Sequence, residues 1–174
     1  MQRHDGLERW VADMAALCAP DTVVRLDGSE EERARLEAEA VAAGELVALD
    51  PARHPGSFYH RIAPRDAART EDLTFVCTAD RADAGPTNNW MEPAEGYRRA
   101  ADLVRGTMKG RTMYVVPFAL GPAGSPSAKA GVQVTDSLAA CLALRIMTRV
   151  GTPALEALGR DGAFTKCLQI GRAH

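Results

Sequence analysis

Segments with the pattern of helices alternate along this chain with short runs that favour strands, and this alternation constrains the fold more than any other feature. Apolar residues recur at intervals of three and four over residues 7–18 and 93–108, which is typical of amphipathic helices. A capped helix is expected from Ser29 to about residue 43. A helix that is apolar nearly all round, and therefore buried on most sides, is expected over 138–150. The predicted strands lie at 23–27, 46–49, 73–78, 113–120 and 132–134. This order predicts the α/β class.

Three positions carry more specific local signals. Ser29 stands three residues before Glu32, which is the spacing of a capping box at a helix N-terminus. Pro93 suits the first residue of a helix, because the N–H that it lacks would have no partner there. Pro117 interrupts the strongest strand pattern of the chain, and a proline inside a strand indicates an edge strand or a bulge.

The composition is that of an ordinary globular domain. Hydrophobic residues make up 46% of the 174 positions and charged residues 25%, which provides enough apolar surface to offset the entropy lost on folding. The net charge is −2 and no run of five like charges occurs, so a nucleic-acid partner is not expected. No stretch of about 18 apolar residues is present, so we expect no membrane span. The charged N-terminus lacks the apolar core of a signal peptide.

The four cysteines form no pattern of a disulfide framework or a zinc site. Cys18, Cys77, Cys141 and Cys167 are widely spaced, with no C-x-x-C and no histidine at ligand spacing. In a chain without an export signal, free buried thiols are the expected state.

Three further patterns are weak candidates for chemistry. Residues 106–111 (Gly-Thr-Met-Lys-Gly-Arg) resemble a phosphate loop, but their spacing differs from G-x-x-x-x-G-K-[ST], and a helix C-cap and turn is favoured. Ser125 has no paired histidine, so it is not predicted to be a nucleophile. His54 and His60 have no carboxylate or thiol predicted nearby and are interpreted as surface histidines.

The irregular segment 51–69 is rich in proline and cations, and it ends in a pair of arginines. Arg65 and Arg69 are four residues apart, so they can share one face of a helical turn. An arginine binds carboxylate or phosphate through a bidentate fork that lysine cannot copy. By composition alone, a solvent-exposed turn held by salt bridges is the favoured interpretation.

A second polar segment, Thr-Asn-Asn-Trp at 87–90, has two interpretations. A polar loop that ends in a large aromatic residue can bind a ligand. It can also cap the following helix and bury Trp90, and the chemistry of the residues favours this second interpretation.

Several longer motifs resemble the GTP-dependent phosphoenolpyruvate carboxykinases, in the order of that family and over about residues 6–168. They are the segments 27–32 (DGSEEE), 83–91 (DAGPTNNWM), 108–118 (MKGRTMYVVPF), 121–126 (GPAGSP), 135–137 (TDS) and 145–149 (RIMTR). The chain departs from the family at 138–140, where Leu-Ala-Ala replaces a segment with proline and tyrosine, and at Ala123, where leucine is common.

The resemblance implies a fold and an activity. Residues 1–168 would form part of the N-terminal, substrate-binding domain, with a mixed sheet and flanking helices. The family converts oxaloacetate and GTP to phosphoenolpyruvate, GDP and carbon dioxide in gluconeogenesis, in the cytoplasm. It uses manganese, with a second divalent ion such as magnesium on the nucleotide, and a monomer is expected.

The resemblance implies one site residue in this chain. Segment 64–69 is similar to the family segment whose last arginine binds the substrate carboxylate, so that role falls to Arg69. The family's phosphate loop, metal ligands, reactive cysteine and guanine-binding aromatics lie beyond residue 174. No catalytic residue, cofactor ligand or metal ligand is therefore assigned here, and we expect no carboxykinase activity from the chain alone.

Two other interpretations stay open. The chain could be a non-catalytic α/β module that binds a small dicarboxylate through Arg69, or a scaffold protein without such a ligand. Residues 169–174 (Gln-Ile-Gly-Arg-Ala-His) resemble one reading frame of sequencing-adapter DNA, so a non-native tail is expected there. We also expect the helix at 138–150 to pack on sequence outside this chain.

Overall fold

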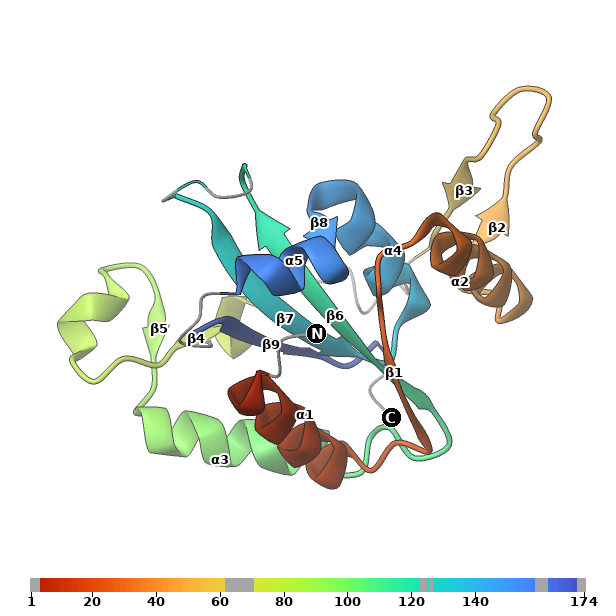
Figure 1. Cartoon of the computed structure of the whole chain (residues 1–174). Helices are drawn as coiled ribbons and strands as arrows, with labels where there is room; N and C mark the ends of the chain where they lie inside the picture. The colour runs from red at the N-terminus through yellow and green to blue at the C-terminus, as the bar shows by residue number, and fades with distance from the viewer. Residues whose placement is uncertain (1–3, 62–70, 123–124, 126, 159–162, 172–174) are drawn as a thin grey trace. The chain divides into compact units, whose positions relative to one another are not determined.

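The computed structural model (Figure 1) describes residues 4–61, 71–122, 125, 127–158 and 163–171. The chain divides into two compact units. The first is formed by residues up to 61 and from 106 onward, and the second lies within 62–105.

A mixed five-stranded sheet forms the centre of the first unit (Figure 1). The strand order is β1-β6-β7-β9, and β8 pairs with β6 as well. β6 is parallel to β1 and antiparallel to β7 and β8, while β9 is parallel to β7. The strands are β1 (Thr22–Arg25), β6 (Thr112–Leu120), β7 (Lys129–Thr135), β8 (Arg149–Val150) and β9 (Thr165–Gln169). The α/β class and the mixed sheet are thus confirmed.

Four helices and a small hairpin accompany this sheet. The helices are α1 (Asp5–Cys18), α2 (Glu30–Ala42), α4 (Leu138–Met147) and α5 (Thr152–Ala157), and the hairpin pairs β2 (Val47–Ala48) with β3 (Phe58–Tyr59) in antiparallel fashion. None of the helices in the described part of the chain combines the length and apolarity needed to cross a membrane. The strand expected at 46–49 is shorter than predicted, and β3 lies in a segment that was expected to be irregular.

One face of β6 carries a core shared with α2 and α4. Tyr114, Val116 and Phe118 alternate along the strand, so their side chains lie on the same face. They join a cluster with Leu26, Leu36, Ala40, Leu46, Leu138, Cys141 and Val150. Met113 and Val115, which face the other side of the strand, are also buried, which means that β6 is covered on both faces.

Pro117 lies in this interior strand, and its pairing with Val132 continues the register without a bulge. The prediction of an edge strand or a bulge was therefore wrong. The carbonyl of Pro117 accepts the Gly151 N–H at 2.9 Å on the edge of β6 away from β7. A residue's nitrogen faces the same edge as its carbonyl, so the missing N–H takes no bond from the ladder with β7. On that edge β1 ends beside Val115, and β8 ends beside Phe118.

The apolar helix expected at 138–150 ends at Met147 as α4 and is followed by β8. Leu138 and Cys141 are buried, but Ile146 is 88% exposed and Met147 is 67% exposed. Within this chain the helix is not buried on most sides, because α2 and the sheet cover only one side of it. That its exposed side packs on sequence outside the chain stays a prediction.

Within its described residues, the second unit contains short elements and one longer helix. They are the 3₁₀-helices η1 (Glu71–Leu73) and η2 (Arg81–Ala84), the parallel strands β4 (Phe75–Val76) and β5 (Asn89–Trp90), and α3 (Pro93–Val104). Pro93 is the first residue of α3, as predicted. The prediction of a buried strand at 73–78 is wrong, because only Phe75–Val76 forms a strand and Leu73 is 73% exposed.

All four cysteines are free thiols, as expected. Cys18 and Cys141 are buried, Cys167 is half-buried and Cys77 is exposed. The expectation of burial is therefore corrected for Cys77, which follows the short strand β4 in the second unit.

Candidate functional site

The sequence-predicted site residue Arg69 lies outside the described residues, as does its partner Arg65. The described candidates are the polar groups of the remaining motifs and two hollows on the first unit.

The turn at 106–111 contains backbone N–H groups that already have partners. Gly106 and Met108 donate to the carbonyls of Leu17 and Cys18, and Gly110 donates to Oδ1 of Asp21 at 2.9 Å. A phosphate loop needs free N–H groups directed at the ligand. The interpretation of this segment as a turn is confirmed, and these three N–H groups are not available to a phosphate.

A buried carboxylate joins two of the motifs. Asp136 has a side chain only 2% exposed, and its Oδ2 lies 2.6 Å from Nη1 of Arg111. Its Oδ1 accepts the N–H of Gly171 at 2.6 Å. Burial of this carboxylate is tolerated because a cation and a backbone donor stabilise its charge. Asp136 thereby holds the start of β6 and the end of β9 to the end of β7.

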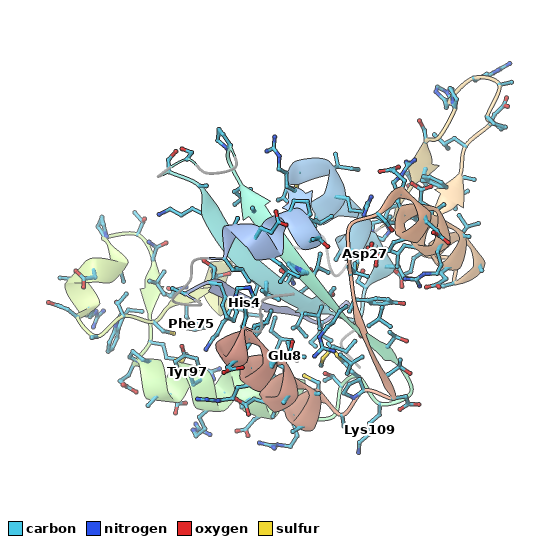
Figure 2. All side chains as sticks on the ribbon, in the orientation of Figure 1. His4, Glu8, Asp27, Phe75, Tyr97 and Lys109 are labelled. Atoms are coloured by element: carbon cyan, nitrogen blue, oxygen red, sulfur yellow. The ribbon has the colours of Figure 1, made fainter. Side chains whose placement is uncertain are left out.

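The turn between β1 and α2 is held by a buried glutamate, and Asp27 in this turn is labelled in Figure 2. The Ser29 hydroxyl accepts the Glu32 N–H at 3.1 Å, which confirms the predicted N-cap. The Glu32 carboxylate does not return to the Ser29 N–H, as a standard capping box requires. It accepts the N–H groups of Asp27 and Gly28 at 3.1 and 2.9 Å, while Ser29 N–H donates to Asp27 Oδ1 at 2.7 Å. This bond lowers the pKa of Asp27.

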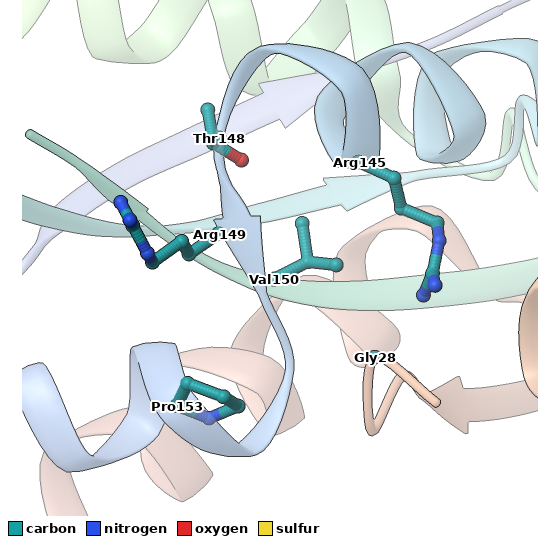
Figure 3. Close-up of a pocket in the computed structure, with 6 residues that line it drawn as sticks. All are labelled: Gly28, Arg145, Thr148, Arg149, Val150 and Pro153. Carbon is teal, nitrogen blue, oxygen red and sulfur yellow. The ribbon is translucent and has the colours of Figure 1, made fainter. Parts of the chain in front are cut away.

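A hollow of about 350 Å³ lies beside this turn (Figure 3). Its lining comprises Gly28, Arg145, Thr148, Arg149, Val150 and Pro153. Figure 3 shows the side chains of Arg145 and Arg149 pointing away from each other on either side of Val150. Their guanidinium groups therefore do not converge on one ligand.

Arg145 is the one charged residue of the apolar helix α4, and its side chain is 9% exposed. Its Nη2 lies 3.3 Å from Glu30 and its Nη1 lies 3.9 Å from Glu32. Within the described part of the chain, Nε and Nη1 have no hydrogen-bond partner. Arg145 was not predicted to be a buried ion-pair residue, although a lone arginine in an apolar helix was a usable signal.

A second, larger hollow of about 840 Å³ lies between α2, α4 and the β2–β3 hairpin. Its walls include apolar residues such as Phe58, Leu142 and Ile146. Glu45 lies nearby and accepts the Ala139 N–H at 3.1 Å, so a carboxylate of the chain itself occupies the N-terminus of α4. No sequence signal identified Glu45 for this role.

The polar segment 87–90 bonds to its own backbone neighbours. Asn88 and Asn89 donate to the carbonyls of Ala84 and Thr74 at 2.6 and 3.2 Å, and the indole of Trp90 donates to Thr78 at 3.0 Å. These bonds support the structural interpretation over the ligand-binding one. The helix cap itself is different from that expected, because Glu92 caps α3 by accepting the Glu95 N–H at 3.0 Å.

The remaining candidates are placed as follows. Nδ1 of His60 lies 2.7 Å from the carbonyl oxygen of Glu45, and His54 is exposed. Ser125 Oγ lies 2.8 Å from Ser127 Oγ. In the described ranges, no three His, Cys, Asp or Glu side chains gather as a set of metal ligands.

Two core groups have strongly raised pKa values. Burial raises the pKa of the Cys141 thiol from its ordinary value of 9.0 to about 12. Burial and then the Glu39 carboxylate raise the pKa of Tyr114 from 10.0 to about 12. Cys141 is therefore a protonated, unreactive thiol at neutral pH rather than a nucleophile.

Comparison with known proteins agrees with the motifs. A model of the phosphoenolpyruvate carboxykinase N-terminal domain family matches residues 9–171. Several bacterial proteins named phosphoenolpyruvate carboxykinase (GTP) are similar to this chain.

The relative from Anaeromyxobacter dehalogenans (strain 2CP-C) is 52% identical over 159 residues, which are 91% of this chain and 27% of the relative. The relative from Corynebacterium efficiens is 47% identical over 165 residues, 95% of this chain and 27% of that protein. The relative from Chlamydia caviae is 43% identical over 166 residues, 95% of this chain and 28% of that protein.

The chain thus spans little more than a quarter of the length of these curated relatives. The resemblance inferred from the motifs is confirmed by a match that covers nearly all of the chain. This chain belongs to the phosphoenolpyruvate carboxykinase N-terminal domain family.

Proposed function

We propose that this chain is the substrate-binding part of an enzyme that converts oxaloacetate and GTP to phosphoenolpyruvate, GDP and carbon dioxide. The observation that carries the proposal is the 52% identity over 91% of this chain to a protein named phosphoenolpyruvate carboxykinase (GTP). The motif order from residue 27 to residue 149 supports it.

Within this enzyme, Arg69 is proposed to bind a carboxylate of the substrate. The support is the similarity of segment 64–69 to the family's substrate-binding segment. A guanidinium fork gives two parallel hydrogen bonds to a carboxylate, which fixes the orientation of the dianion as well as its position.

The described residues are proposed to act as a scaffold for this site. The turn at 106–111 donates N–H groups to the chain itself, and the Asp136 carboxylate is paired with Arg111. Such internally bonded groups hold strands and turns in place, and they leave phosphoryl transfer to residues that lie elsewhere in the enzyme.

Manganese, and magnesium carried by the nucleotide, are proposed for the whole enzyme. The described residues hold no set of three metal-ligating side chains, so neither ion is assigned to any of them. Phosphoryl transfer depends on groups that neutralise the phosphates, and the chain alone is therefore proposed to be inactive. A monomeric state and a cytoplasmic location are proposed on the family resemblance.

Residues 169–174 are proposed to be a non-native tail, on their likeness to adapter-derived sequence. The family match runs to residue 171, Gln169 is the last residue of β9, and the Gly171 N–H donates to Asp136. The coding DNA after the Leu168 codon tests the proposal. Coding DNA that matches no adapter after the Leu168 codon would contradict it.

The activity proposal is tested in the enzyme encoded by the whole gene, by measuring formation of phosphoenolpyruvate from oxaloacetate and GTP. Arg69→Gln leaves a shorter, neutral and polar side chain without the guanidinium charge and fork, so kcat/KM for oxaloacetate should fall by about 10- to 100-fold. Arg65→Gln, four residues earlier, is the matched control and should change it by less than threefold.

The outcomes separate the interpretations. An inactive wild-type enzyme, or equal losses for the two variants, would contradict the proposal. Turnover by the 174-residue chain alone would overturn the part that assigns phosphoryl transfer to residues outside it. Binding of a dicarboxylate without any turnover by the whole-gene product would favour the non-catalytic module.

A further inference from the structure

No further inference is drawn: the strongest candidate, the hollow between the turn at Gly28 and the end of α4 beside the buried guanidinium of Arg145, carries nothing because Glu30 and Glu32 already flank that guanidinium, the side chain of Arg149 points away on the other side of Val150, and nothing among the described residues shows what fills it.

Discussion

Gly28 and Gly151 lie back to back, each in a conformation with positive φ, at the point where the chain leaving β1 meets the chain leaving β8. Their φ angles are +81° and +78°. A Cβ on Gly28 would overlap the carbonyl oxygen of Val150, and a Cβ on Gly151 would overlap that of Asp27. The Thr152 N–H donates to the same Asp27 carbonyl at 3.0 Å. Two turns therefore share a junction beside Pro117 that has no room for a side chain.

The first prediction concerns this junction. Gly151→Ala should lower the free energy of unfolding by about 3 kcal/mol or more, because the strained backbone conformation and the steric overlap add. Gly44→Ala is the matched control, since Gly44 has φ +72° but nothing within 4 Å of a Cβ, and it should cost only about 1 kcal/mol. Urea denaturation of the three proteins measures both values, and equal losses would contradict the close contact.

The second prediction concerns the buried glutamate beside this junction. In Glu32→Gln, an NH2 group that cannot accept a hydrogen bond replaces one of the two carboxylate oxygens that accept the N–H groups of Asp27 and Gly28. The substitution also removes a negative charge near Arg145. The free energy of unfolding should fall by about 1–3 kcal/mol. Glu31→Gln, on the adjacent exposed position of the same helix, should change it by about 0.5 kcal/mol or less. A Glu32 variant as stable as the Glu31 variant would argue against this role.

The third prediction concerns alkaline pH. Folding raises the pKa of Cys141 from 9.0 and that of Tyr114 from 10.0, each to about 12, because burial favours the neutral form. Their contribution to stability is complete below the unfolded-state values and is lost as pH rises through the folded-state values. The free energy of unfolding should therefore fall between pH 9 and pH 12.

Tyr114→Phe tests the third prediction because it removes one of the two groups. Its unfolding free energy should depend less steeply on pH over this range than that of the wild type. Tyr59→Phe, at a residue 52% exposed, is the control and should keep the wild-type slope. A Tyr114 variant with an unchanged slope would show that the phenol does not contribute.

Local sequence signals predicted helices and their first residues correctly where the signal depends only on neighbouring residues. The helical spacing at residues 7–18, the Ser29 cap and the Pro93 start are all present in the structure. The prediction for Pro117 failed because the exception depends on two strands, β1 and β8, that meet end to end on one edge of β6. That arrangement depends on segments far apart in the chain, so the residues around Pro117 carry no signal of it.

The proposal of Arg69 as a site residue depends on the long motifs and stays a prediction. A single arginine pair at 65 and 69 has the chemistry to bind a carboxylate, but composition alone favoured an ordinary exposed turn. The buried ion pairs of Asp136 and Arg145 join residues far apart in the chain. The pairing of strands β6 and β7 brings Arg111 to Asp136, and the packing of α4 on α2 brings Arg145 to Glu32. Spacing rules, which relate close neighbours, do not reach such pairs.

The most direct test of the central claim is a calorimetric titration of the 174-residue chain with phosphoenolpyruvate. The account predicts saturable binding by the wild type and by Arg65→Gln, and a loss of binding by Arg69→Gln. At 100 times the dissociation constant, the ligand should also add about 2.7 kcal/mol to the free energy of unfolding. No binding by the wild type, or binding that Arg69→Gln leaves unchanged, would contradict the assignment of this chain as the substrate-binding part of a carboxykinase.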